Sequence, residues 1–438
     1  MSGEVVRHKT PHRKSTMSST VIIGAGIIGV STAYYLSDHQ PPSTIHLVEL
    51  APELFSSASG HAGGFLAKDW FQPSVESLGA LSFDLHTKLA EEHGGKEKWL
   101  YSPTTSLDYS LASKGNSAGG RGNDWLRHGT SRAQAAPAEA EGTTKTVKHA
   151  PTWLRREPGD CVEVISGRDT TAQLDPRRLC DFLLQESLKR GVRLHHPASV
   201  TNASVDVRGE LAGVRIVDEK LGIETDLPCT RIIIAAGVWS EKVFRGLFRH
   251  STLKMPVGSL AGHSLVLRSP RWRGVEGDEC HAIYTTHGEG FAPEIYARLG
   301  GDIFIGGVNS PDLPIPKVPG KAGVYGEEIA RLKKTTKALL GSTEADGSSD
   351  DSDLEIVRQA LCFRPVTPRG TPIVSRVPDE HLGDAMATRP GPGGGVYVAT
   401  GHGPWGISMA LGTGVVVAEL AQGRPLSADI SALGLFDE

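Results

Sequence analysis

The stretch Thr20-Val21-Ile22-Ile23-Gly24-Ala25-Gly26-Ile27-Ile28-Gly29 decides the fold, because it joins a short apolar run to three closely spaced glycines. The apolar residues before Gly24 predict a buried strand, and the apolar spacing that starts at Ile27 predicts a helix. A second apolar run, Ile45–Val48, ends on Glu49. Strand, glycine turn, helix, strand and acid is the order of a βαβ nucleotide-binding unit.

Each glycine of this turn has its own physical task. Gly24 permits the tight turn, Gly26 lets the main chain approach a pyrophosphate, and Gly29 lets the helix pack closely on the strand. The first turn of the helix then faces the phosphates. Glu49 can accept hydrogen bonds from both ribose hydroxyls, and its charge repels a 2′-phosphate, which disfavours NADP. At this point the unit predicts either NAD or FAD.

A second glycine-rich turn near the end of the chain separates these two cofactors. An apolar strand leads into Gly401-His402-Gly403-Pro404-Trp405-Gly406, and an apolar helix is predicted from about Ile407 to Leu420. One nicotinamide cofactor has no use for two glycine-rich helix starts. A helix N-terminus aimed at the flavin O2 stabilises the anion that appears as the ring is reduced. We therefore predict FAD, with the small residues of 56–65 lying against it.

Length and composition limit the class of protein. The 438 residues predict two or three lobes, and the balance of 46 basic against 50 acidic residues argues against a nucleic-acid partner. No apolar stretch is long enough to span a membrane, and the scattered cysteines show neither metal-ligand spacing nor a disulfide pattern. We expect a cytoplasmic protein, with endosome association as a further hypothesis and a mitochondrial presequence in the basic arm 1–18 as the alternative.

The predicted fold class is α/β. It combines a Rossmann-like, glutathione-reductase-like FAD-binding domain with an interleaved α+β substrate domain built on an antiparallel sheet. The FAD-binding domain is expected to be discontinuous, with residues 19–67, 171–240 and 366–438. The substrate or cap domain takes residues 68–170 and 241–365. In the middle piece, Asp175 is the predicted N-cap of a helix that ends before Gly191.

Two segments of the substrate domain lack apolar periodicity. Residues 113–150 are rich in Gly, Ala, Ser and Lys, and residues 341–353 form an acidic Ser/Gly run. We interpret both as mobile surface insertions and expect neither to carry chemistry.

Four motifs together resemble the D-amino-acid-oxidase-like FAD oxidoreductases, which include glycine oxidase and sarcosine oxidase. The motifs are the first glycine turn with Glu49, the run Ile234-Ala235-Ala236-Gly237-Val238-Trp239-Ser240, the run Cys362-Phe363-Arg364-Pro365-Val366-Thr367-Pro368, and Gly401-His402-Gly403 with Gly412-Thr413-Gly414. The resemblance covers nearly all of residues 18–428. It is strongest to fungal oxidoreductases, some of which are linked to late endosome-to-Golgi transport.

The resemblance implies oxidation of the C–N bond of an amino acid or a secondary or glycated amine, by hydride transfer to flavin N5. Arg364 corresponds to the arginine that pairs with the substrate carboxylate in glycine-oxidase-like members, and a guanidinium fork matches a carboxylate in two parallel hydrogen bonds. The alternative for Arg364 is a structural salt bridge. Arg298 could share or replace the clamp, with Tyr296 as a hydrogen-bond partner. His61 and His402 either adjust the charge near the ring or are structural.

Two further positions bear on the flavin. Cys362 aligns with the cysteine that sarcosine-oxidase-like members attach to flavin, but its neighbours resemble the non-covalent members, so we predict dissociable FAD with a covalent link as the alternative. Those members also place an oxygen-activating lysine where this chain has Trp405. This departure leaves both a dehydrogenase and a slow oxidase open.

The residues predicted to bind the cofactor are Gly24, Gly26, Ile27, Ile28, Gly29, Glu49, Ser57, Ser59, Gly63, Gly64, Phe65, Val200, Ala236, Gly237, Trp239, Gly401, Gly403, Pro404, Trp405, Gly406 and Ile407. A second hypothesis belongs to another class, in which FAD is structural and the protein binds a partner in endosome-to-Golgi traffic. The basic arm and the acidic run Ser348–Asp353 are the features that such a partner could recognise. Substrate identity and oligomeric state stay open.

Overall fold

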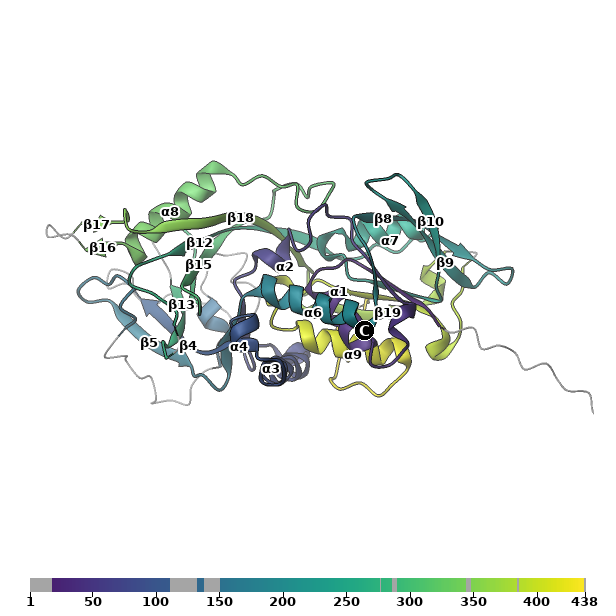
Figure 1. The fold of residues 1–438 in the computed structure, drawn as a ribbon, viewed down its shortest axis with the longest axis horizontal. Helices are drawn as coiled ribbons and strands as arrows, with labels where there is room; N and C mark the ends of the chain where they lie inside the picture. The colour runs from purple at the N-terminus through teal and green to yellow at the C-terminus, as the bar shows by residue number, and fades with distance from the viewer. Residues whose placement is uncertain are drawn as a thin grey trace, which may run out of the picture.

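The computed structural model describes residues 18–110, 132–137, 150–275, 277–285, 290–343, 348–383 and 386–436. Figure 1 shows an elongated molecule with a large curled sheet at one end, a smaller sheet at the other and helices between them. The predicted arm 1–18, apart from its last residue, and most of the predicted insertion 113–150 lie outside the described residues.

A six-stranded sheet carries the nucleotide-binding unit. Its strands, in spatial order, are β19 (Ile373–Val377), β20 (Gly395–Thr400), β11 (Arg231–Ile234), β1 (Thr20–Ile23), β2 (Ile45–Val48) and β7 (Arg193–His195). All neighbours are parallel except β19 and β20. β1, β2, β11 and β20 are buried along their whole length, as parallel strands covered on both faces should be.

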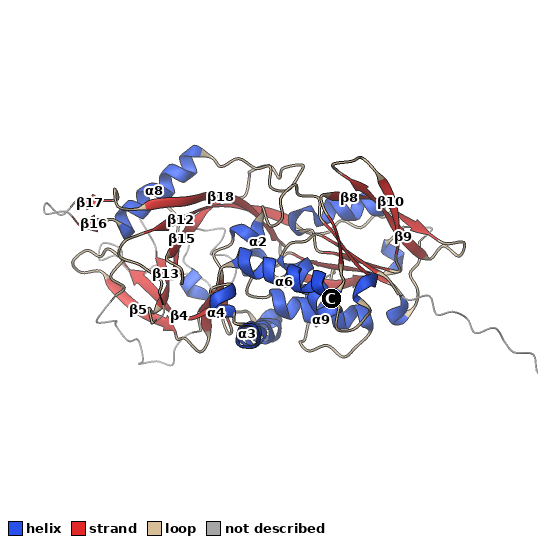
Figure 2. Cartoon of the chain, viewed as in Figure 1, coloured by secondary structure: helices blue, strands red, loops and turns tan. Residues whose placement is uncertain are grey.

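Alternate residues of β1 enter two different cores. Ile22 packs with the helices that cover one face of the sheet, whereas Val21 and Ile23 pack with the elements of the other face. The first face carries α1 (Ile27–Leu36), α3 (Pro73–His93), α6 (Pro176–Arg190) and α9 (Ala410–Gln422). The second face carries α7 (Ser240–Leu247) and the antiparallel strands β8 (Ala198–Val205), β9 (Leu211–Asp218) and β10 (Glu224–Pro228). Figure 2 shows α3, α6 and α9 in the middle of the molecule.

A nine-stranded sheet forms the other end. Its path is β18 (Glu355–Val366), β12 (Gly258–Arg268), β15 (Asp302–Ser310), β14 (Glu294–Ala297), β13 (Cys280–Thr285), β4 (Ser102–Ser110), β6 (Thr171–Gln173) and β3 (Phe65–Ala67), with β5 (Cys161–Ser166) paired to β4. Its pairs are antiparallel, as predicted, apart from β13 with β4. α8 (Gly326–Leu340) packs on it. β3 and β6, which lie within the ranges predicted for the FAD-binding domain, therefore pair in this second sheet.

The capping residues of α6 are those predicted from the sequence, whereas α9 starts later than predicted. Asp175 caps α6 by accepting a hydrogen bond from the Arg178 amide at 3.0 Å, and Gly191 ends the helix in the left-handed conformation at φ 108°. α9 begins at Ala410 rather than at Ile407. The predicted start is wrong because a 3₁₀ turn, η6 (Gly403–Trp405), and a further turn come first.

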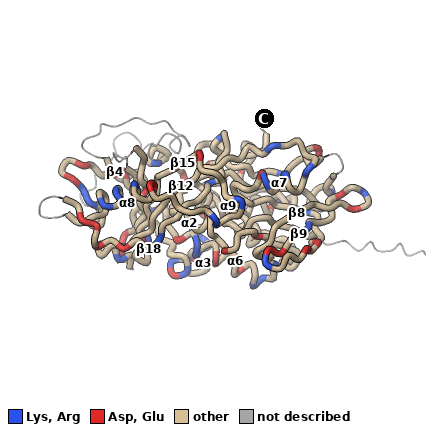
Figure 3. Tube along the Cα trace, turned by 90° about the horizontal axis from the view of Figure 1, so that it is seen from above, with Lys and Arg blue, Asp and Glu red and all other residues tan. Residues whose placement is uncertain are grey.

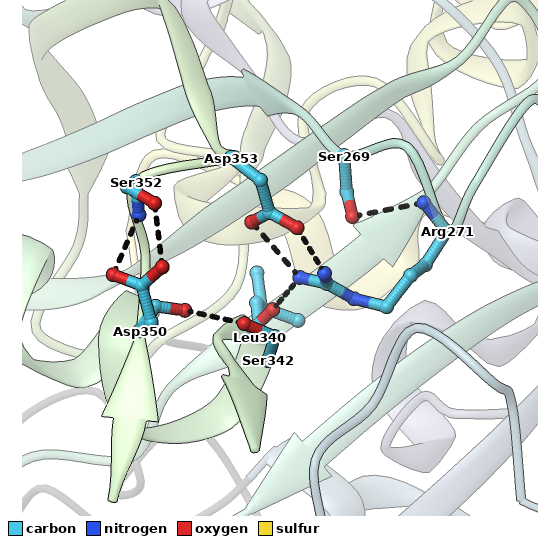
Figure 4. Close-up of polar contacts among 7 residues, drawn as sticks. All are labelled: Ser269, Arg271, Leu340, Ser342, Asp350, Ser352 and Asp353. Atoms are coloured by element: carbon cyan, nitrogen blue, oxygen red, sulfur yellow. Dashed lines mark hydrogen bonds and ion pairs between the residues drawn. The ribbon is translucent and has the colours of Figure 1, made fainter. Parts of the chain in front are cut away.

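The acidic run forms local structure in its described part. Short strands β16 (Ser342–Thr343) and β17 (Ser349–Asp350) pair with each other, and Asp353 forms an ion pair with Arg271 (Figure 4). The Asp350 carboxylate accepts hydrogen bonds from the amide and the hydroxyl of Ser352. These carboxylates therefore have partners inside the chain.

Two surface properties follow from the described residues. Figure 3 shows that the positions of basic and acidic residues are interspersed along the chain trace. Within the described ranges, no helix has both the length and the apolar character needed to cross a lipid bilayer.

Candidate active site

One cavity of about 420 Å³ is lined by both ends of the molecule. Its walls come from the β1–α1 turn, the end of β2, the short helix α2 (Ala58–His61) and the β20–α9 connection, all on the nucleotide side. The nine-stranded sheet contributes a further wall through β12, β14, β15 and β18. The cavity is therefore placed where the two sheets meet.

The first glycine turn is packed so tightly that side chains are excluded. Gly24 has a φ of 103°, and a Cβ built on it would lie 2.5 Å from the Ala235 carbonyl oxygen. A Cβ on Gly29 would lie 1.9 Å from the Gly24 carbonyl oxygen. Because both clashes are with main chain, neither can be relieved by a rotamer change. The sequence prediction for these two glycines thus has a direct geometric basis.

Glu49 and Ser59 hold the surroundings of this turn. The Glu49 carboxylate accepts hydrogen bonds from the Ala25 amide at 2.8 Å and the Ala51 amide at 2.7 Å. The Ser59 hydroxyl accepts one from the Ile27 amide at 2.9 Å. α2 is thereby tied to the first turn of α1. Both acceptors line the cavity.

At the other side of the cavity, Arg364 of β18 lies over a glycine of the neighbouring strand. A Cβ on Gly262 would lie 2.0 Å from Arg364 Nη1, so only glycine leaves room for the guanidinium. Arg364 Nη1 donates a hydrogen bond to Asn309 Oδ1 at 2.7 Å. Within the part of the chain that the structure describes, Arg364 pairs with an amide and not with a carboxylate.

A polar cluster on β14 lines the same cavity. Tyr296 donates a hydrogen bond to Glu294 Oε2 at 2.8 Å, and Arg132 Nε lies 3.0 Å from Glu294 Oε1. The Arg132 guanidinium also stacks over the ring of Trp405, 4.8 Å from its centroid. Burial raises the pKa of the Tyr296 phenol far above its ordinary value, so this side chain is neutral.

The comparisons with known proteins decide the family. The family model described as FAD dependent oxidoreductase matches residues 19–420. The chain belongs to this family. Across 96% of this chain and 98% of the relative, it is 28% identical to the Schizosaccharomyces pombe protein named Putative oxidoreductase C1F5.03c. The Saccharomyces cerevisiae protein named Putative oxidoreductase TDA3 is 25% identical across 94% of this chain and 93% of its own length.

Solved structures show the same fold at low identity. Glycine oxidase from Geobacillus kaustophilus matches with a TM-score of 0.68 at 18% identity, covering 96% of this chain and 99% of that one. The predictions of an FAD-dependent oxidoreductase and of an α/β fold that joins a Rossmann-like unit to an antiparallel second sheet are confirmed.

The residues present fit the family's cofactor. The glycine turn offers main chain with no room for a Cβ, as a pyrophosphate-binding turn requires. At the other end of the cavity, His402 Nε2 bonds to Thr413 Oγ1 at 3.0 Å, while its buried Nδ1 has no protein partner among the described residues. Burial lowers the pKa of His402 to about 3, so the ring is neutral and one of its nitrogens can serve as an acceptor.

Most of the predicted cofactor residues line the cavity. They are Gly24, Gly26, Ile27, Ile28, Glu49, Ser57, Ser59, Gly63, Gly64, Phe65, Val200, Ala236, Gly237, Trp239, Gly403, Pro404, Gly406 and Ile407. Gly29, Gly401 and Trp405 do not line it. Gly29 is turned to the main chain of Gly24, and Trp405 is buried against Phe71 and Trp70.

The predicted catalytic residues divide in the same way. Arg364, Tyr296 and His61 line the cavity, and burial lowers the pKa of His61 to about 4, which keeps its ring neutral. Arg298 does not line it. Its buried guanidinium lies over the Phe304 ring and donates to the Ala62 carbonyl at 3.4 Å. The prediction that Arg298 could hold the substrate is therefore not supported by its position.

Sequence reasoning missed two charged residues of the site. Arg132 lies in the insertion that was expected to carry no chemistry, yet only 6% of it is exposed and it lines the cavity. Glu294 lies two residues before Tyr296 and so shares its side of the strand. An acid alternating with a tyrosine in an otherwise apolar strand was the available signal for Glu294. No local pattern marks Arg132.

Proposed function

We propose that this protein oxidises the C–N bond of an amino acid or of a related secondary or glycated amine. The observation that carries the proposal is the placement of Arg364. Its guanidinium lies at the cavity wall, over Gly262, and its described partner is an amide rather than an acid. A guanidinium without a carboxylate partner in a partly buried cavity is suited to an anionic ligand.

The protein contributes orientation rather than a side-chain base. Bound FAD supplies the two-electron oxidant. Arg364 holds the carboxylate, and the aromatic wall of Phe304 and Tyr296, whose rings stack at 5.5 Å, fixes the plane in which the substrate lies. Neutral His61 adds no positive charge to the cavity, and the amine binds as the neutral free base after giving its proton to water. Glycine oxidase shares the fold and supports this substrate class.

The first test is the visible spectrum of the purified protein under anaerobic conditions. D- and L-amino acids, N-methyl amino acids and glycated amines are added in turn. A compound of this panel is expected to bleach the flavin bands. Flavin bands that remain unchanged with every compound would contradict the proposed reaction.

The clamp is tested by Arg364→Ala. Affinity for a carboxylate ligand such as propionate, measured from its effect on the flavin spectrum, is expected to fall by about tenfold to a hundredfold. Arg268→Ala is the matched control, because Arg268 forms a surface ion pair with Asp302 and lies outside the cavity lining. If the unsubstituted protein and Arg364→Ala bind propionate with equal affinity, Arg364 does not hold the carboxylate.

The partner-binding hypothesis, with its endosome-associated location, is weighed second. Among the described residues of the acidic run, Asp350 and Asp353 are engaged by Ser352 and Arg271. The ion pair with Arg271 offsets the negative charge of Asp353, one of the charges that a partner could recognise. Deleting residues 1–16 together with 344–352 tests it: loss of a trafficking phenotype with the flavin spectrum preserved would favour that hypothesis over catalysis.

A further inference from the structure

A buried polar cluster lines the same cavity as Arg364. We define the Glu294 cluster as Arg132, Glu294 and Tyr296. Glu294 and Arg132 are only 9% and 6% exposed, and Tyr296 only 1%, yet all three line the cavity. The salt bridge from Arg132 Nε and the hydrogen bond from the Tyr296 hydroxyl reach different oxygens of the same carboxylate.

The Glu294 cluster offers a hydrogen-bond acceptor, and the Arg132–Glu294 pair as a whole carries no net charge. The positive charge of Arg132 balances the negative charge of Glu294. A carboxylate has about four lone-pair sites, so Glu294 keeps acceptor capacity beyond the two partners named here. A buried carboxylate at a cavity wall is costly to desolvate unless a donor from the ligand replaces water. The cluster therefore favours a ligand group that donates a hydrogen bond and is itself neutral.

The floor between Arg364 and Glu294 is short, and the Phe304 ring lies over its middle, at Gly306. Glu294 pairs across the sheet with Gly306, and Gly306 pairs with Ser264. Gly262, under the Arg364 guanidinium, lies two residues along the chain from Ser264. Strands β12 and β14 are separated only by β15, which places them about 10 Å apart. A ligand with a few carbons between its two ends can reach both sites.

We propose that the substrate carries a neutral hydrogen-bond donor, a carboxamide or a hydroxyl, at the end opposite its carboxylate, and that Glu294 accepts from it. This inference rests on the proposed function and narrows its substrate class. An alkyl end desolvates Glu294 without replacing its hydrogen bonds. A second carboxylate is repelled by Glu294, and an ammonium adds a positive charge that the cluster does not compensate.

Four carboxylate ligands of similar length test the preference without turnover. They are glutaramate with a carboxamide end, hexanoate with an alkyl end, glutarate with a second carboxylate, and 5-aminopentanoate with an ammonium end. Each is titrated into the FAD-loaded protein while the flavin spectrum is recorded. Glutaramate is expected to bind about tenfold more tightly than the other three. Equal binding of glutaramate and hexanoate, or tightest binding of either charged-end ligand, overturns the inference.

Glu294→Gln shows whether this carboxylate is responsible. The preference for glutaramate over hexanoate is expected to fall from about tenfold to about twofold. Glu419→Gln is the control, because Glu419 is also 9% exposed and accepts hydrogen bonds from Ser427, but lies outside the cavity lining. A preference that survives Glu294→Gln overturns the assignment. If Glu294→Gln does not retain FAD, Tyr296→Phe is used instead. It removes one partner of the carboxylate and is expected to change the ratio of the affinities for glutaramate and hexanoate.

The ligand set separates this inference from the proposed function. If the ligands bind and Arg364→Ala weakens all of them equally, the carboxylate clamp stands whatever the distal preference. If none of the four perturbs the flavin spectrum, both the clamp and the Glu294 assignment fail.

Discussion

Replacing Gly262 by alanine should disable the carboxylate site while leaving the fold intact. The new Cβ would lie 2.0 Å from Arg364 Nη1 and 2.6 Å from Cζ and Nη2. Ordinary contacts between such atoms are about 3.5 Å, so the guanidinium must move by roughly 1.5 Å. The clash is with the far end of a flexible side chain, which can swing away. We therefore expect the free energy of unfolding to change by no more than about 1 kcal/mol.

The binding penalty is larger than the stability penalty. Hydrogen bonds to charged groups are worth about 1.5–3 kcal/mol, and a shift of this size removes at least one of the two that a guanidinium fork makes. The Kd for propionate should rise about tenfold to a hundredfold, as measured by titration of the flavin spectrum. Gly258→Ala is the control on the same strand, because its Cβ meets Val366 Cγ2 at an ordinary 3.7 Å. Unchanged propionate affinity in Gly262→Ala would refute the assigned position of the clamp.

Three further predictions concern the first glycine turn, a buried histidine and the attachment of FAD. Gly29→Ala should yield protein without bound FAD, since its Cβ meets main chain at 1.9 Å, whereas Gly326→Ala, with no atom within 4 Å, should retain it; absorbance at the flavin band decides. Burial lowers the pKa of His86 to about 4. Its contribution to the free energy of unfolding is therefore complete above pH 6.5 and falls by about 1.4 kcal/mol per pH unit between pH 6.5 and pH 4. Chemical unfolding at pH 7 and 5 should show a shallower acid loss in His86→Gln; an equal loss would contradict it. If FAD is not bound through Cys362, acid precipitation should leave all the flavin in the supernatant.

The nucleotide side could be predicted from sequence because its determinants are local. Gly24, Gly29 and Glu49 act within one βαβ unit, so spacing along the chain reports spacing in the fold. The caps of α6 are equally local, and both were predicted correctly. Trp405 shows the limit of this reasoning. It sits inside a correctly predicted turn, but its large ring is buried against Phe71 rather than exposed to the cavity.

The substrate side depends on which strands become neighbours. Arg298 follows Tyr296 by two residues and was predicted to share its task. In the structure, the Phe304 ring stacks on the Tyr296 ring and also contacts the Arg298 guanidinium, and Arg298 donates to the Ala62 carbonyl. The register of β14 against β15 decides which side chains meet the Phe304 ring, and this register cannot be inferred from the spacing of residues within one strand.

Arg132 could not be predicted from its local sequence. The segment around it has the composition of a surface insertion, and by composition alone a buried cation there is unexpected. Its burial becomes understandable only when Glu294 and Trp405 are placed beside it, one from a strand of the large sheet and one from the second glycine turn. Breaking such a buried pair costs more than never forming it, because one charge is left without compensation. Arg132 is thereby tied to the cavity by its charge, and the polarity of the cavity wall around Glu294 depends on a residue that lies in neither of the two large sheets.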